Sequence, residues 1–368
     1  MPTIIEILSQ KISDKQQAIE DFFAKKFQQY PQLFYNSVDL RHSGFKIAPV
    51  DTNCFPAGFN NLSQTSKTAA KIIADKKEVV VGALIAELTA KTAIDLEDGS
   101  FATLHPLTNK SGKISTLDGF EPDVIVLNND LTDGIPPILE NINIPIVPPT
   151  SMGWHSRTKS HHFDIYNELA TELAQILEID PWLISSMHRS CHDVNFKEQK
   201  GLECLAQYVD KMIENLRKKY QEYGINEEPY CYIKADNGTY GIAVWPVFSG
   251  AEVLEINKKE RNKMNMLKGS VQNTKALVQE GIKTIDKIDN KIAEPMIYMI
   301  DGKVVGNLFR VNEARDEKIS LNAAGASFFD LTELSEDQLT LGLEKNKIAA
   351  IYAVIARLAA LASSIENQ

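Results

Sequence analysis

The sequence contains none of the short motifs that mark the most common nucleotide-binding and hydrolytic enzymes. It has no G-x-x-x-x-G-K-[ST] phosphate loop, no G-x-G-x-x-G after a first strand, no H-E-x-x-H zinc motif and no G-x-S-x-G nucleophile motif. P-loop NTPases, Rossmann dehydrogenases, zinc metalloproteases and α/β-hydrolases are therefore excluded. If the protein binds phosphate, it must do so with a different structural motif.

Cysteine and positive charge are also scarce. The four cysteines form no C-x-x-C pair and no zinc-type spacing, which predicts free thiols in a reducing compartment, the cytoplasm. The first residues contain no long apolar segment followed by a cleavage site, so we expect no export signal. With 39 Lys plus Arg against 49 Asp plus Glu, the net charge is -10, which argues against a broad nucleic-acid surface.

Long hydrophobic runs are limited to one, at residues 348–365, and Arg357 lies near its middle. A charge at the centre of a membrane span is costly, so the run predicts a packed helix and no membrane partner. The 368 residues, 43% hydrophobic and 24% charged, are typical of a globular enzyme with two domains.

Periodicity divides the chain into three parts. An amphipathic helix is expected at 4–30, a strand at FKIAPVDTN and a helix at 63–75. The short apolar runs EVVVGALI, DVIVLNND and NIPIVPP predict a small α/β region between residues 76 and 152.

The last part predicts helices followed by hairpins. Helical patterns cover 162–177 and 201–224, the second ending at Gly224. Two apolar runs at 228–247 surround a polar turn, and Asp301-Gly302 marks the turn of a second hairpin. The Lys- and Asn-rich segment 258–283 between them is predicted to be helical.

One candidate phosphate-binding segment is YIKADNGTYG, residues 232–241. Lys234 ends a predicted strand, and the glycine-containing turn after it allows close backbone approach to a polyphosphate. The alternative is a surface hairpin with a chance lysine, which this segment alone does not exclude.

A second candidate is the pair Asp51 and Asn53 in APVDTNCFPAGFNN. Residues two apart in a strand lie on one face, and their hard oxygens suit Mg²⁺, which completes its shell with water and phosphates. The alternative is that both side chains cap the turn at 56–61.

A third group contains arginines that suit a carboxylate or phosphate. Arg310 lies on the second strand of the later hairpin, Asn322 precedes an Ala-Ala-Gly turn that offers backbone N–H groups, and Arg41 precedes Asp51 by ten residues. The alternative for Arg310 and Asn322 is a solvated strand end followed by a turn of small residues. The alternative for Arg41 is a surface ion pair.

The segment GWHSRTKSHHF contains three histidines. Arg157 and Lys159 among them would repel a divalent cation, so phosphate contact or a structural role is favoured over a transition-metal site. Lys159 is then a second cation for nucleotide phosphates.

Taken in this order, the motifs resemble those of bacterial glutamate-cysteine ligases of the ATP-grasp type. The matching stretches span most of the chain: LRHSGFKIAPVDTNCFPAGFNNL, VLNNDLTDGIP, MGWHSRTKSHHF, YIKADNGTYG and EPMIYMIDGKVVGNLFRVN. The early position of VDTN is similar to that of the metal motif in eukaryotic glutathione synthetase, a circularly permuted ATP-grasp enzyme.

The resemblance implies a fold of the α/β (α+β) class, a permuted ATP-grasp fold with a small α/β substrate domain. Its parts would be residues 1–75, which supply the metal-binding strand, 76–152, the substrate domain, and 153–368, the ATP-grasp domain with its flap. The implied ligands are ATP and Mg²⁺, and the implied site residues fall into four groups. Metal binding is implied for Asp51, Asn53 and Asp236, nucleotide binding for Lys159, Lys234, Gly238, Thr239 and Glu294 (at the adenine hinge), substrate binding for Arg41, Ser43 and Arg310, and catalysis for Arg310, Asn322 and Lys234.

The implied reaction joins the γ-carboxylate of glutamate to the amine of cysteine through an acyl phosphate, the first step of glutathione biosynthesis. Neither step needs a protein nucleophile, which agrees with the missing hydrolase motifs. Glutathione synthetase and a catalytically silent nucleotide-binding homologue are the alternatives. The substrates are small molecules, and a homo-oligomer is compatible with the sequence.

Overall fold

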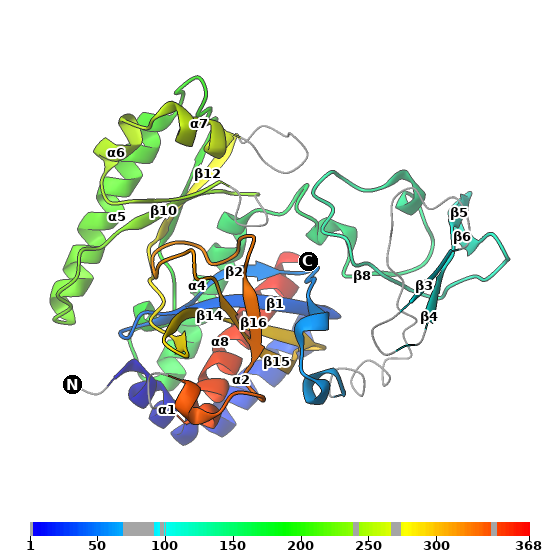
Figure 1. Ribbon diagram of the computed structural model, residues 1–368, viewed down its shortest axis with the longest axis horizontal. Helices are drawn as coiled ribbons and strands as arrows, with labels where there is room; N and C mark the ends of the chain where they lie inside the picture. Colours follow the sequence, from blue (N-terminus) through cyan, green and yellow to red (C-terminus); the bar gives the residue numbers. More distant parts are fainter. Residues whose placement is uncertain are drawn as a thin grey trace.

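The computed structural model is a mixed α/β protein with two antiparallel sheets and a smaller lobe (Figure 1). It describes residues 3–68, 92–95, 99, 101–237, 243–265, 274–339 and 344–368. The predicted strand EVVVGALI and most of the helix predicted at 63–75 lie outside these residues, although 64–68 are helical.

The larger sheet joins the beginning of the chain to its last third. Its strands run in the order β16-β15-β14-β1-β2, with β13 beside β14, and every pairing is antiparallel. The predicted hairpin is confirmed, because Asp301 and Gly302 turn with φ of 50° and 63°. The strand bounds are β1 Tyr35–His42, β2 Ile47–Asn53, β13 Lys287–Ile288, β14 Lys291–Ile300, β15 Lys303–Val311 and β16 Ser327–Asp330.

One face of this sheet packs on α8 (Lys345–Glu366), which contacts β1, β2, β14 and β15. The helix is long and apolar enough to cross a membrane, but 72% of its apolar window is buried inside the molecule. Arg357 donates to Glu20 with both terminal nitrogens, at 2.6 and 2.9 Å. The prediction of a packed helix is confirmed.

The helix predicted at 4–30 is two helices, α1 (Ile4–Asp14) and α2 (Gln16–Gln29). A capping box between Thr3 and Glu6 starts α1, and the break falls at Lys15, whose φ of -111° is not helical. The break lets α1 pack on α8 while α2 packs on α4 (Lys159–Leu177).

The smaller sheet has the strand order β11-β10-β12-β9 and is covered on one face by α5. The prediction of a helix over all of 258–283 is wrong, because α7 is followed by strand β12. That strand is buried along nearly its whole length at the centre of the sheet, so it lacks the alternation that reveals a half-buried strand. The bounds are β9 His188–His192, α5 Leu202–Glu222, β10 Cys231–Ala235, β11 Val244–Val247, α6 Gly250–Leu254, α7 Lys258–Asn265 and β12 Lys275–Glu280.

The smaller lobe, drawn at the right of Figure 1, consists of short strand pairs. Its parallel pair β7–β8 coincides with the predicted runs DVIVLNND and NIPIVPP. The predicted domain limits stay a prediction. The strands are β3 Thr92–Asp95, β4 Phe101–Leu104, β5 Leu107–Lys110, β6 Lys113–Thr116, β7 Ile125–Val126 and β8 Ile146–Val147, with 3-10 turns at Pro137–Leu139 and Thr150–Met152.

The prediction of four free cysteines is wrong for two of them. Cys191 on β9 and Cys204 on α5 form a disulfide, because the packing of α5 on the small sheet brings them together. Cys54 and Cys231 are free and buried. Burial raises the pKa of the Cys54 thiol to about 11, so it packs as a small apolar side chain. A cytoplasmic location stays a prediction.

Candidate active site

The face of the large sheet that turns away from α8 is polar. Val38 and Leu40 are fully buried on the α8 side, and the strand period of two places Asp39 and Arg41 on the opposite face. Asp39 pairs with Asp51 across β1 and β2, and Glu294 pairs with Arg310 across β14 and β15. The predicted shared face of Asp51 and Asn53 therefore belongs to a wider polar surface. Its members are Ser37, Asp39, Arg41, Asp51, Asn53, Glu294 and Arg310.

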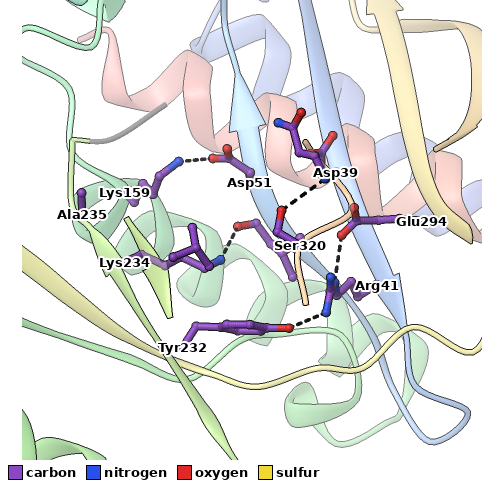
Figure 2. Close-up of a pocket in the computed structure, with 12 residues that line it drawn as sticks. Asp39, Arg41, Asp51, Lys159, Tyr232, Lys234, Ala235, Glu294 and Ser320 are labelled. Atoms are coloured by element: carbon purple, nitrogen blue, oxygen red, sulfur yellow. Dashed lines mark hydrogen bonds and ion pairs between the residues drawn. The ribbon is translucent and has the colours of Figure 1, made fainter. Parts of the chain in front are cut away.

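Two lysines from other elements complete a narrow cavity of about 50 Å³ above this face, which we call the lysine cavity (Figure 2). Lys234 of β10 donates to the carbonyl of Val50 at 3.2 Å and to Oε1 of Gln279 at 2.7 Å. Lys159, the first residue of α4, forms an ion pair with Asp51 and lies 4.3 Å from the ring of Trp154. The two predicted phosphate-binding lysines therefore meet in one cavity.

The electrostatics of the lysine cavity favour an anionic ligand. Burial, reinforced by the nearby Lys159, lowers the pKa of Lys234 to about 7. The partial burial of Asp51 would by itself raise its pKa, but Lys159 and Lys234 hold the pKa below its usual range. At neutral pH the cavity thus holds the ionised carboxylate of Asp51 beside Lys234, which is only partly protonated. A bound anion would raise the pKa of Lys234 and complete its protonation.

A second cavity of about 240 Å³ adjoins the same sheet face, and we call it the arginine cavity. Arg310 enters it with Nη1 bonded to Asp39 at 3.0 Å and to Glu294 at 3.1 Å. Its Nε is buried and has no hydrogen-bond partner among the described residues. An unpaired buried N–H is costly, so this guanidinium is suited to receive a carboxylate or phosphate.

Three residues line both cavities: Asp39, Asp51 and Asn322. A molecule extending from the lysine cavity into the arginine cavity would pass these side chains. The structure therefore brings the predicted residues Asp51 and Asn322 together at the junction, far apart though they are in the sequence. Trp154, Tyr298 and Phe328 add an aromatic wall to the arginine cavity.

The oxygen donors at the junction suit Mg²⁺. The side chain of Asp51 is 37% exposed, and Asn53 lines the same cavity, although its Oδ1 also accepts from the backbone of Phe55 at 2.9 Å. No group of three or more His, Cys, Asp or Glu suited to a metal exists among the residues that the structure describes. Mg²⁺ commonly uses one or two carboxylates and completes its shell with phosphates and water, so this donor set fits it.

Asp236 does not have the predicted place of a metal ligand. Its side chain is fully buried and lines neither cavity. One oxygen accepts from the backbone N–H of Ser160 at 2.8 Å and the other from the Ser160 hydroxyl at 2.7 Å. Asp236 therefore holds the first turn of α4, and with it Lys159, against β10.

Ser43, expected to bind substrate, lies outside both cavities. It lies in the turn between β1 and β2, where its hydroxyl contacts the backbone of Lys46 at 3.3 Å, and it lines neither cavity. The predicted sites Gly238 and Thr239 lie outside the described residues.

Arg41 and Glu294 line the lysine cavity, but their hydrogen bonds differ from those expected of a substrate clamp and an adenine contact. Arg41 is 2% exposed and donates to Glu294, Tyr232 and three backbone carbonyls, so it has no free pair of N–H groups for a carboxylate clamp. Glu294 accepts from Arg41 on one oxygen and from Arg310 on the other. Glu294 therefore links the two arginines through its two carboxylate oxygens. Neither of these contacts indicates a position at an adenine hinge.

Two functional candidates were missed in the sequence, Asp39 and Tyr232. Burial raises the pKa of Asp39 despite the adjacent Arg310. Asp39 precedes Arg41 by two residues, and Tyr232 precedes Lys234 by two. The strand period places Tyr232 on the face of Lys234 in the predicted strand, and it would have placed Asp39 on the face of Arg41 had β1 been recognised.

Two residues of the histidine segment, Arg157 and His162, form a buried cluster with Glu366. His162 pairs with Glu366, which also accepts from Arg157 at 2.7 and 3.1 Å. Nη1 of Arg157 donates to the carbonyl of Thr52, between the two predicted metal ligands. The ion pair with Glu366 gives His162 a structural contact, and the preference for structure or phosphate contact over a transition-metal site stays a prediction.

Comparisons with known proteins found a matching family and a similar solved structure. The model of a family described as glutamate-cysteine ligase matches residues 9–77 and 71–367. A crystal structure from Methylobacillus flagellatus KT, described as a proposed gamma-glutamylcysteine synthetase, is 33% identical with a TM-score of 0.84, over 98% of this chain and 95% of that one.

D-alanyl-alanine synthetase A from Vibrio cholerae O1 biovar eltor is 15% identical with a TM-score of 0.31, over 79% of this chain and 75% of that one. A likeness at this level supports no conclusion. No curated protein sequence matches the chain.

Proposed function

Since the chain belongs to the glutamate-cysteine ligase family, we propose that it joins the γ-carboxylate of glutamate to the amine of cysteine, using MgATP on a permuted ATP-grasp scaffold. The observation that carries this proposal is the pair of adjoining cavities that share Asp39, Asp51 and Asn322. A reaction in which a carboxylate first takes a phosphoryl group and then meets an amine needs such a junction.

In this mechanism the lysine cavity holds the phosphates. Lys159 and Lys234 supply positive charge on the side of the transferring phosphoryl group, where charge must be neutralised. Mg²⁺, when bound, would neutralise and orient the phosphate oxygens, and Asp51 with Asn53 would hold it, Asp39 lying opposite. Lys234 gains its full charge when phosphate binds, because an anion raises the pKa that burial has lowered.

The arginine cavity would hold the amino-acid end of the substrate. The Nε of Arg310, which has no partner in the part of the chain that the structure describes, can pair with a carboxylate while Asp39 and Glu294 fix the guanidinium. Asn322 at the junction can donate its amide N–H to the acyl oxygen, on which negative charge develops when the amine attacks. No protein nucleophile takes part.

An amino-acid panel tests this function. Release of ADP from ATP should require glutamate, and formation of γ-glutamylcysteine should require cysteine as well. If ADP appeared only with γ-glutamylcysteine plus glycine, the protein would be a glutathione synthetase. If ATP bound but no amino acid released ADP, the protein would be a silent homologue.

A further inference from the structure

The segment between β15 and β16, residues 312–326, has no helix or strand and borders the lysine cavity. It carries Ser320 and Asn322 to the cavity wall, and Figure 2 shows Ser320 close to Arg41 and Glu294. Residues 312–326 therefore form the part of the wall that is least supported by regular secondary structure.

Three consecutive backbone carbonyls of this segment are held by two side chains. Nη1 of Arg41 donates to the carbonyl of Glu317 at 3.2 Å, and Nη2 of Arg41 donates to that of Ile319 at 2.8 Å. The hydroxyl of Tyr232 donates to the carbonyl between them, that of Lys318. Nη1 of Arg41 also donates to the Tyr232 hydroxyl at 2.5 Å, so the two side chains act as one unit.

Arg41 and Tyr232 connect the two sheets. Arg41 is on β1 of the large sheet and Tyr232 is on β10 of the small sheet, and they are 2% and 3% exposed. Nε of Arg41 is fixed by Glu294 at 2.8 Å, and the guanidinium lies 5.5 Å from the Tyr232 ring. Nη1 of Arg41 also donates to the carbonyl of Ile282 at 3.0 Å. Buried hydrogen-bonded networks favour a single geometry, so these contacts restrict the positions that the segment can take.

We propose that Arg41 and Tyr232 are positioning residues that hold residues 317–322 closed over the lysine cavity, which keeps Asn322 at the junction and water away from the acyl phosphate. The proposal rests on the function given above. It replaces the predicted role of Arg41 as a substrate clamp with a role exerted through the backbone of this segment.

The acyl phosphate has two fates, and the closed segment selects between them. When the amine nitrogen bonds to the acyl carbon, the bond to the phosphate oxygen breaks, phosphate leaves, a proton is lost and an amide results. When a water oxygen bonds to the same carbon, phosphate also leaves, but the carboxylate is regenerated and ATP is consumed without product. Exclusion of water is therefore needed for coupling.

The variant Tyr232→Phe tests the proposal, because it removes only the hydroxyl. The matched control is Tyr166→Phe, whose buried hydroxyl donates to the carbonyl of Ile184 at 2.7 Å and lines neither cavity. ADP and γ-glutamylcysteine are quantified together at saturating glutamate, cysteine and MgATP. We expect about one ADP per dipeptide in wild type and Y166F, and about two or more in Y232F, with dipeptide formation slowed roughly tenfold.

A second variant, Arg41→Lys, keeps the charge but cannot reach the carbonyls of both Glu317 and Ile319, and should show the same excess of ADP. If Y232F unfolds at a clearly lower temperature than Y166F, the ADP-to-dipeptide ratio of Arg41→Lys decides the test instead. A ratio that stays at one in both variants overturns the positioning role. An absence of amino-acid-dependent ADP release in wild type would instead overturn the proposed function.

Discussion

Asp39 and Asp51 face each other across strands β1 and β2, and both line the lysine cavity and the arginine cavity. Each carboxylate has a basic partner on its own side, Arg310 for Asp39 and Lys159 for Asp51. Two adjacent acids would repel one another without these cations. The carboxylate oxygens of Asp39 and Asp51 therefore lie where the lysine cavity, proposed to hold phosphates, meets the arginine cavity, proposed to hold an amino acid.

Asp51→Asn should abolish most activity and leave the fold intact. Loss of the carboxylate weakens the hold on Mg²⁺, so turnover should fall by roughly 100-fold or more, and the stabilisation of the protein by MgATP in a thermal unfolding assay should shrink. Asp164→Asn, at an exposed partner of His188, is the control and should behave as wild type. An Asp51→Asn protein with normal turnover and a normal MgATP shift would remove Asp51 from the metal site.

The affinity for ATP should weaken as the pH rises. Since the pKa of Lys234 is about 7 in the ligand-free protein, fewer molecules carry its charge above that pH. The dissociation constant for ATP should therefore rise from about pH 7 to about pH 9, by up to about tenfold per unit. Calorimetric titration measures this. In Lys234→Arg the charge is permanent, so the dependence should be largely absent; equal slopes in both proteins would contradict the assignment.

Arg310→Lys should affect an amino acid and not the nucleotide. Lysine keeps the charge but loses the Nε–H and the planar fork, so the KM of one amino acid should rise about tenfold or more while that of ATP stays within about twofold. Steady-state kinetics with each substrate varied would show this, with Arg217→Lys at an exposed ion pair as the control. Unchanged KM values for both amino acids would refute the clamp.

Glu366→Ala should destabilise the protein much more than Glu20→Ala. Glu366 is buried between Arg157 and His162, so its removal strands a buried charge at a cost of about 3–5 kcal/mol. Glu20 pairs with Arg357 at the surface, where the loss should be below about 1 kcal/mol. Urea unfolding distinguishes them, and similar small losses would show that the buried cluster is not a structural anchor.

Local sequence patterns were enough to predict the parts of the site that lie within one strand or hairpin. Asp51 and Asn53 share a face because of the strand period, and Arg310 follows a recognisable Asp-Gly hairpin. The family resemblance then supplied the order of the motifs. By contrast, β12 is buried at most positions, so it shows no clean alternation of polar and apolar residues.

The side chains that lie away from their expected places have partners distant in sequence. The carboxylate of Asp236 is occupied by Ser160, which precedes it by 76 residues, and the guanidinium of Arg41 by carbonyls more than 240 residues later. No local pattern encodes such pairings, because they arise only when the two sheets pack together. The disulfide between Cys191 and Cys204 was missed for the same reason.

The central claim is that the γ-carboxylate of glutamate is phosphorylated at the junction of the two cavities, and transfer of an oxygen isotope tests it most directly. Glutamate labelled with ¹⁸O in its γ-carboxylate is incubated with MgATP and cysteine, and the released phosphate is analysed by mass spectrometry. The account predicts one ¹⁸O atom in the phosphate for each dipeptide formed. Phosphate that contains no oxygen from glutamate would contradict it.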